Sequence, residues 1–155
     1  MEKKEERYER LLPQLAALVE GETDETAVMA NVAAALQTEF EWWWTGFYRV
    51  RGGELLLGPF QGTVACMHIG YGKGVCGTAW KEGQTQVVPD VELFPGHIAC
   101  SELSRSEIVV PVRGQNGEIR AVLDIDSKQL GTFDETDRHY LEKVAAIISQ
   151  QIYNQ

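Results

Sequence analysis

The chain has 155 residues, 44% of them hydrophobic and 24% charged, a composition typical of a soluble protein that folds as a single domain over residues 1–155. No apolar run approaches the ~20 residues that a membrane helix needs, and the charged residues 1–6 lack the apolar core of a signal peptide, so we expect a cytoplasmic location. The net charge of −9 argues against nucleic acid as a partner, because phosphate binding needs a basic surface.

Two helices are predicted in the first 40 residues. Apolar side chains recur on one helical face over residues 8–19, although Pro13 either kinks this helix or marks where its stable part starts. A second helix should run over residues 24–40, with Thr23 or Asp24 as the N-cap.

The pattern then changes to strands. Residues 44–51 are rich in aromatic residues and end in alternation, Gly52-Gly53 predicts a hairpin turn, and residues 54–57 return as the next strand. Three tryptophans, Trp42 to Trp44, precede this hairpin. Strand alternation would send Trp43 and Trp44 to opposite faces, so at least one of them should line a pocket or a subunit contact.

The middle of the chain, residues 58–106, reads as long loops laid over one face of the sheet, where binding sites tend to lie. It contains short strand-like runs at 65–69 and 86–88, and a short helix is expected after Gly74.

A second hairpin and a final helix complete the chain. Strands are predicted over residues 107–113 and 119–127, joined at Asn116-Gly117, a strong hairpin signal. Residues 132–135 resemble a capping box before a helix whose apolar face runs over 141–152. This order of elements predicts an α+β fold, with helices on one face of an antiparallel sheet and a loop-covered pocket on the other.

The second hairpin also predicts a cluster of acids. If Gln115 pairs with Glu118 across a two-residue turn, Glu107 lies opposite Asp126 and shares one face with Asp124 and Asp126. A longer loop or a bulge would change this pairing. Three such carboxylates would bind a cation, either a ligand ammonium or a metal, or one of them would keep its proton. The alternative is a solvated strand end.

Three cysteines, Cys66, Cys76 and Cys100, form no C-x-x-C pair, which argues against a structural zinc site. In a reducing compartment they need not pair, and the simplest alternative is that all three are inert buried side chains.

Two of these cysteines have neighbours that bear on their reactivity. Residues 72–77 match G-x-G-x-x-G, but no βαβ unit surrounds them, so we reject a dinucleotide site. The same run would place Cys76 near a helix N-terminus, where a thiolate is favoured. His97 precedes Cys100 by three residues and, if protonated, would lower its pKa; a surface histidine is the alternative.

Seven segments together resemble the free methionine-(R)-sulfoxide reductases, which are single GAF-domain enzymes. The resemblance covers nearly the whole chain from the first helix onward, and the segments that carry it include all three cysteines: residues 44–48, 57–62, 65–66, 74–79, 96–100, 106–111 and 123–127. The chain departs from the family pattern mainly in the extra tryptophans before Trp44.

The resemblance implies a GAF-like fold and the thiol-dependent reduction of free methionine (R)-sulfoxide, with thioredoxin as the electron donor and no metal or organic cofactor. Members of the family are often homodimers. The reactive cysteine of the family corresponds to Cys100, its disulfide partner to Cys66, and a third redox cysteine to Cys76.

The resemblance also implies a substrate pocket made of Trp44, Tyr48, Glu107, Asp124 and Asp126. In such a pocket a protonated Glu107 or Asp126 would activate the sulfoxide oxygen, while another carboxylate holds the substrate ammonium. Cys100 would become a sulfenic acid, with which Cys66 condenses to a disulfide.

Two alternatives share the fold but not the chemistry, namely a non-catalytic GAF module that senses a small ligand and a redox sensor that signals to a partner. Fold alone does not decide between them and an enzyme. The combination of three cysteines with three carboxylates favours the enzyme, because a module that only binds a ligand does not need it.

Overall fold

An antiparallel sheet forms the centre of the computed structural model, which describes residues 2–97 and 103–154. Within those residues the strands are β1 (Trp44–Arg51), β2 (Glu54–Gln61), β3 (His68–Ile69), β4 (Gln86–Val88), β5 (Ser106–Arg113) and β6 (Ile119–Ser127). Their order across the sheet is β3-β2-β1-β6-β5-β4, and every pairing is antiparallel. The two central strands, β1 and β6, come from different hairpins, so the sheet joins both halves of the chain.

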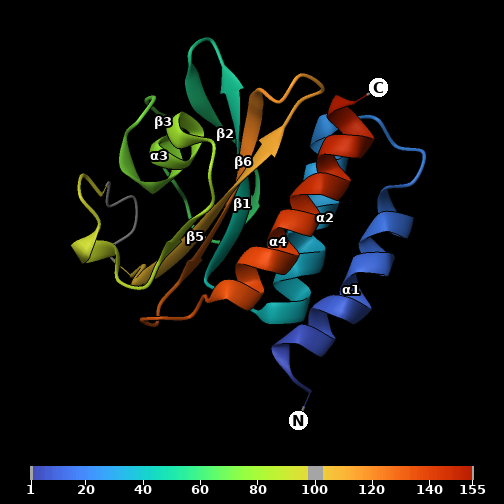
Figure 1. The fold of residues 1–155 in the computed structure, drawn as a ribbon, viewed down its shortest axis with the longest axis horizontal. Coiled ribbons are helices and arrows are strands. Elements are labelled where there is room, and N and C mark those ends of the chain that lie inside the picture. The colour runs from blue at the N-terminus through green and yellow to red at the C-terminus, as the bar shows by residue number, and fades with distance from the viewer. Residues whose placement is uncertain (1, 98–102, 155) are drawn as a thin grey trace.

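Three long helices cover one face of this sheet (Figure 1). They are α1 (Lys4–Val19), α2 (Glu25–Phe40) and α4 (Glu135–Ile148), the last followed by a π-helical turn, η2 (Ser149–Tyr153). Helix α4 packs against β5, α2 packs against β1 and β2, and α1 packs against α2 and α4. Their apolar stripes and the inward face of the sheet form the larger core, to which β5 and β6 contribute alternate residues as predicted. None of the described helices is long and apolar enough to cross a membrane.

The starts of these helices settle two points that the sequence left open. Helix α1 begins at Lys4 and continues through Pro13, so its stable part does not start at the proline. Helix α2 begins after Asp24, which is its N-cap because Asp24 Oδ1 accepts a hydrogen bond from Ala27 N at 2.9 Å.

The capping box of α4 lies further along the chain than predicted. Asp134 is the N-cap and Asp137 the return partner, in place of Thr132 and Glu135. Asp137 is buried and also accepts hydrogen bonds from Tyr8 Oη at 2.6 Å and Lys4 Nζ at 2.7 Å. One carboxylate therefore caps α4 and fastens α1 to it.

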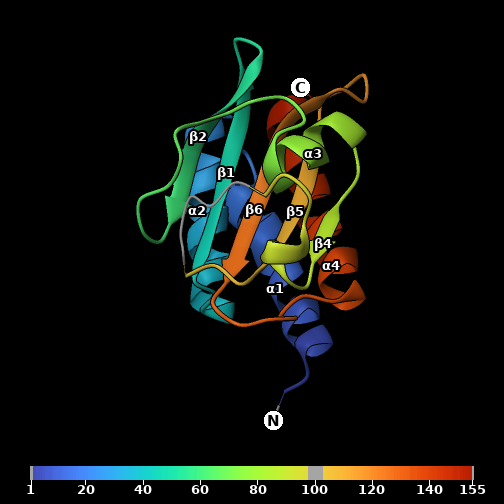
Figure 2. The same cartoon turned by 90° about the vertical axis from the view of Figure 1, so that its left-hand side faces the viewer.

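The opposite face of the sheet is also covered (Figure 2). Here lie α3 (Gly74–Glu82), the 3-10 turn η1 (Val91–Leu93) and the loops between them, which enclose a second apolar cluster around Trp44, Tyr48 and Cys76. Strand β2 extends to Gln61, beyond its predicted end, and the strand-like run at 65–69 is reduced to β3.

The hairpin of β5 and β6 has the predicted register for an unpredicted reason. Its loop has three residues, because Gly114 N donates to Glu118 O at 2.7 Å, which shifts the pairing by one. A bulge at Arg120 shifts it back, since Val112 pairs with Ala121 but Arg113 pairs with Ile119. Beyond the bulge the two changes cancel, and the predicted strand faces are confirmed.

Candidate active site

A pocket lies between the outer face of the sheet and the segments that cover it. Aromatic and apolar side chains line it together with a few convergent polar groups, which is usual for a small-molecule site. Side chains from β1, β5, β6 and α3, together with residues 63–65, form its walls. All five residues that the family resemblance assigned to a substrate pocket line it: Trp44, Tyr48, Glu107, Asp124 and Asp126.

Strand β1 supplies an aromatic wall. The rings of Trp44 and Tyr48 are stacked with centroids 6.1 Å apart, and Phe60 stacks on the other side of Trp44 at 5.1 Å. Trp44 Nε1 donates to Thr63 O at 2.9 Å and Tyr48 Oη donates to Cys66 O at 2.8 Å. These hydrogen bonds hold both rings and tie them to the loop that carries Cys66.

Gly46 permits this packing. A Cβ atom at this position would lie 2.3 Å from Phe60 Cβ and 2.7 Å from the Trp44 ring, so any larger residue would force the two rings apart.

The three acids of β5 and β6 face the pocket. Glu107 pairs with Asp126 across the hairpin, and Asp124 lies two residues before Asp126 on the same face. Glu107 and Asp124 are only 6% exposed, which excludes a solvated strand end. Ser104 Oγ donates to Asp126 Oδ1 at 3.0 Å. In the described part of the chain, no lysine or arginine forms an ion pair with any of these three carboxyl groups.

Burial without a paired cation sets the protonation of this cluster. Burial, together with the charge of Asp124, raises the pKa of Glu107 and of Asp126 well above the usual range. Burial also raises the pKa of Asp124, but hydrogen bonds from Glu107, Cys76 and Asp126 oppose the rise. Glu107 and Asp126 therefore hold their protons more tightly than usual, and Asp124 is the member of the cluster whose negative charge the hydrogen bonds favour.

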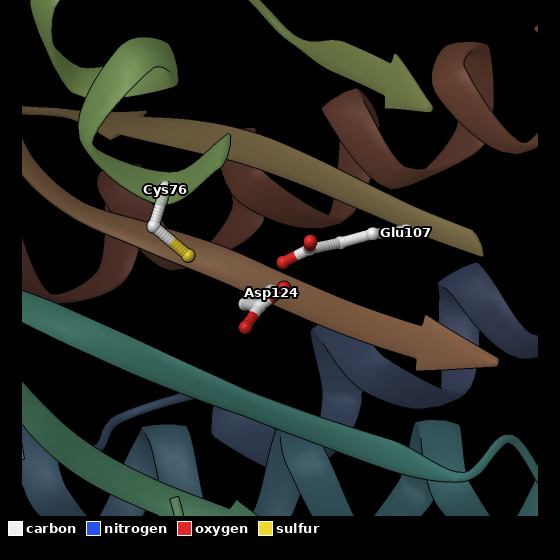
Figure 3. Close-up of side chains that lie close together, drawn as sticks. All are labelled: Cys76, Glu107 and Asp124. Carbon is white, nitrogen blue, oxygen red and sulfur yellow. The ribbon is translucent and has the colours of Figure 1, made fainter. Parts of the chain in front are cut away.

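Helix α3 brings Cys76 to the same place (Figure 3). Cys76 is the third residue of the helix, as the glycine-rich run predicts, and is a buried free thiol. The prediction that the helix N-terminus favours a thiolate at Cys76 is wrong. Burial, followed by the charges of Asp124 and Glu107, raises the pKa of the Cys76 thiol well above its usual value, and this outweighs the helix N-terminus.

Of the other two cysteines, the structure describes Cys66 but not Cys100. Cys66 is half-buried in the loop before β3 and is disulfide-bonded. Cys100 lies outside the described residues. His97 lines the pocket, and burial lowers its pKa, with a smaller opposite effect from Asp124. The lowered pKa makes a protonated His97 less favourable, and its predicted effect on Cys100 stays a prediction because Cys100 is not among the described residues.

Trp43 and Ser104 are among the wall residues that were not assigned from the sequence. Trp43 lies on the same side as Trp44, contrary to the alternation rule, because β1 begins only at Trp44 and Trp43 occupies the bend before it. Trp42 is the ring that turns to the other face, where it stacks on Phe40 at 4.5 Å. Ser104 precedes β5, and no sequence pattern marks it as a partner of Asp126.

One subset of these side chains could hold a metal ion. Ligand atoms of Cys76, Glu107 and Asp124 all lie within 4.8 Å of one another. The sequence argued only against a structural zinc site built from cysteine pairs, and this group is of a different kind.

Comparison with known proteins identifies the family. Residues 22–152 match the model of the GAF domain family. The chain is 41% identical to the free methionine-R-sulfoxide reductase of Saccharomyces cerevisiae over 155 residues, which cover 95% of this chain and 86% of the relative. It is 44% identical to the Escherichia coli protein of the same name, over 92% of this chain and 87% of the relative.

A solved structure extends this likeness to three dimensions. The free methionine-R-sulfoxide reductase of Neisseria meningitidis, determined in complex with its substrate, superposes with a TM-score of 0.95 at 50% identity, covering 97% of this chain and 91% of that one. Likeness at this level extends over nearly the whole chain. The chain therefore belongs to the free methionine-R-sulfoxide reductases of the GAF domain family.

Proposed function

We propose that this protein reduces free methionine (R)-sulfoxide to methionine, with Cys100 as the nucleophile and Cys66 as its disulfide partner. The observation that carries the proposal is the pocket itself, in which two stacked aromatic rings lie beside three neighbouring carboxyl groups, two of them buried. An apolar wall beside proton donors suits a ligand that has a thioether-like end, a sulfoxide oxygen and an ammonium group.

The charged end of the substrate has a natural partner in Asp124. Its Oδ1 atom is buried and has no hydrogen-bond partner among the described residues. A buried acceptor left unpaired costs about 1–3 kcal/mol, which a ligand ammonium would relieve by donating to it. The S-methyl group would then pack against Trp44 and Tyr48, because a polarisable sulfur centre favours aromatic contacts.

The carboxyl groups that keep their protons supply the acid. A sulfoxide is a poor electrophile until its oxygen is protonated or strongly hydrogen-bonded, and Glu107 or Asp126 would donate that proton. Ser104 would orient Asp126 through its hydrogen bond.

The redox steps follow in order. The Cys100 thiolate attacks the substrate sulfur, the oxygen passes to the cysteine with a proton, and methionine leaves as the sulfenic acid forms. The Cys66 thiol then attacks the sulfenic sulfur, a disulfide forms and water leaves. This pairing is supported by a disulfide at Cys66 and a free thiol at Cys76. The buried, protonated Cys76 would act in redox chemistry only after a rearrangement.

Regeneration completes the cycle. We propose that thioredoxin reduces the disulfide by thiol exchange, and that the enzyme works in the reducing cytoplasm, where such exchange is sustained.

The family resemblance favours a homodimer. Residues 1–155 would act as one domain, since Asp137 of α4 holds Tyr8 and Lys4 of α1.

A coupled assay tests this function. We expect NADPH oxidation in the presence of thioredoxin, thioredoxin reductase and free methionine (R)-sulfoxide, and none with the (S) epimer. Cys100→Ser should abolish turnover. Binding of the sulfoxide without turnover by the reduced wild-type chain would indicate a sensor module and contradict the proposal.

A substitution at Glu107 tests its proposed role as the proton donor. Glu107→Gln keeps the size of the side chain but removes the transferable proton, so kcat should fall by about 10²-fold or more. Glu118→Gln, on the exposed turn of the same hairpin, is the matched control and should leave kcat unchanged. Near wild-type turnover in Glu107→Gln would assign the acid to another residue.

A further inference from the structure

We propose that the pocket also binds a thiophilic divalent cation of the Zn²⁺ type, through Cys76 Sγ and one oxygen each of Glu107 and Asp124, and that the cation and the substrate exclude one another. The cation acts as a reversible inhibitor and takes no part in the reaction. The competition between cation and substrate rests on the proposed function, whereas cation binding itself does not.

The geometry of the three groups carries the site. They come from α3, β5 and β6, and Figure 3 shows their polar ends pointing toward one another. Zn–S and Zn–O bonds of about 2.3 and 2.0–2.2 Å put ligands that share one zinc ion roughly 3.5–4 Å apart. The three ligand atoms already lie within 4.8 Å of one another, so small side-chain rotations suffice to bring them around one ion.

The charge of the pocket favours a cation. Glu107 and Asp124 are buried, and neither they nor Asp126 form an ion pair with a lysine or arginine in the part of the chain that the structure describes. Separately, Asp124 Oδ1 is a buried acceptor with no hydrogen-bond partner among those residues. A bound dication would supply both the missing charge and the missing partner.

The donor set selects the kind of ion. A sulfur ligand favours borderline-soft ions such as Zn²⁺, whereas Mg²⁺ and Ca²⁺ prefer shells made only of oxygen. Three protein ligands leave a fourth tetrahedral position for water. On binding, the Cys76 thiol and the Glu107 carboxyl group release their protons to solvent, and no group is oxidised or reduced.

The cation would exclude the substrate because both bind to the same two carboxyl groups. Asp124 is the proposed partner of the substrate ammonium and Glu107 a proposed proton donor, so an ion held by both occupies the same positions. A metal-loaded enzyme would therefore be inactive until a chelator removes the ion.

Co²⁺ is a suitable probe because a cobalt–thiolate bond gives a near-ultraviolet charge-transfer band. Reduced wild-type protein, freed of small thiols, should bind one Co²⁺ with this band, and Zn²⁺ should displace it. Cys76→Ser should lose the band and Cys66→Ser, the matched control, should keep it. Glu107→Gln retains the thiol and should weaken Co²⁺ binding by about tenfold or more. Saturating methionine should remove the band from the wild-type protein.

Two results would overturn the site, namely no band in the reduced wild-type protein, or a band unchanged in both Cys76→Ser and Glu107→Gln. A band that saturating methionine does not reduce would overturn the mutual exclusion of cation and substrate. Turnover with dithiothreitol and a chelator is measured in parallel on the same preparation. A chain that turns over but binds no cobalt refutes the cation site alone, and one that binds cobalt but does not turn over refutes the proposed function alone.

Discussion

Individual side chains in the pocket behave differently from what their local sequence suggests. Cys76 lies at a helix N-terminus, a position that lowers thiol pKa values when it is exposed. Here the thiol is buried beside Asp124 and Glu107, and desolvation and like charge both favour the protonated form. The surroundings of a residue, which come from distant parts of the chain, outweigh its place in its own helix.

This protonation predicts slow alkylation of Cys76. In reduced Cys100→Ser protein near pH 7, iodoacetamide should modify Cys76 much more slowly than a free cysteine, because little thiolate is present. The rate should rise only at pH values above the usual thiol pKa of about 8.5. Mass spectrometry of peptides, with urea-unfolded protein as the control, measures the rate. Equal rates in folded and unfolded protein at pH 7 would contradict the burial of this thiol.

Trp43 and Trp42 offer a second residue-scale prediction. Trp43 Nε1 is a buried donor with no hydrogen-bond partner among the described residues, and its ring lines the pocket with Lys128 Nζ 4.0 Å from its centroid. If the substrate accepts from this donor, Trp43→Phe should raise the KM for methionine sulfoxide by about tenfold, equivalent to one hydrogen bond of ~1.4 kcal/mol.

Trp42→Phe is the matched control for this substitution. Its ring stacks on Phe40 in the core under the helices, away from the pocket, so we expect a loss of about 1–3 kcal/mol in unfolding free energy with KM unchanged. Steady-state kinetics and urea unfolding of both variants separate the two roles. An unchanged KM in Trp43→Phe would mean that the substrate does not use this donor.

At the scale of elements, the junction of α1 and α4 depends on one buried acid. Asp137 accepts hydrogen bonds from Tyr8, Lys4 and its own N-cap backbone. Burial and the neighbouring Asp137 carboxylate raise the pKa of the Tyr8 hydroxyl, so Tyr8 is a neutral donor at all ordinary pH values. The other polar contacts between α1 and α4 with its N-cap are longer, with Lys4 Nζ 3.3 Å from Asp134 Oδ2 and Tyr140 Oη 3.5 Å from Glu5 Oε1.

Asp137→Ala should therefore cost about 3 kcal/mol of unfolding free energy, since it leaves a buried hydroxyl unpaired and removes the return hydrogen bond of the α4 capping box. Asp24→Ala removes an exposed cap of α2 and should cost about 1 kcal/mol. Urea unfolding monitored by circular dichroism compares the two variants. Equal losses would show that the link between α1 and α4 adds nothing beyond helix capping.

For the whole molecule, the buried acids make stability depend on pH. Glu107 and Asp126 have raised pKa values in the folded state, so the folded chain holds protons that the unfolded chain releases above about pH 4. Their contribution to stability is full below the unfolded pKa and is lost as the pH rises toward the folded value. Stability should thus decline from pH 5 to pH 8, by at most about 1.4 kcal/mol per pH unit for each group.

Glu107→Gln removes one of these titrating groups and should flatten the decline. Urea unfolding of both proteins at pH 5, 6, 7 and 8 measures the two slopes. A slope unchanged by the substitution would mean that Glu107 ionises normally in the folded protein.

Much of this fold was predictable from sequence because helices and hairpins leave local signals. The bounds of β1 and β4 and the assignment of faces in β5 and β6 agree with the alternation of apolar and polar residues. Because side chains in a strand repeat every two residues, the register of one hairpin was enough to bring Glu107, Asp124 and Asp126 together. The same pattern missed Trp43, which lies just outside the strand.

The sequence by itself determined the elements, the shared face of three acids, and three cysteines in a pattern typical of one enzyme family. Only the tertiary structure decided that these acids are buried without a paired cation, that Cys76 is protonated beside them, and that Trp43 joins the pocket wall. The physical reason is that periodicity is a property of neighbouring residues, whereas burial and pKa depend on α3 and the loops that cover the sheet from elsewhere in the chain.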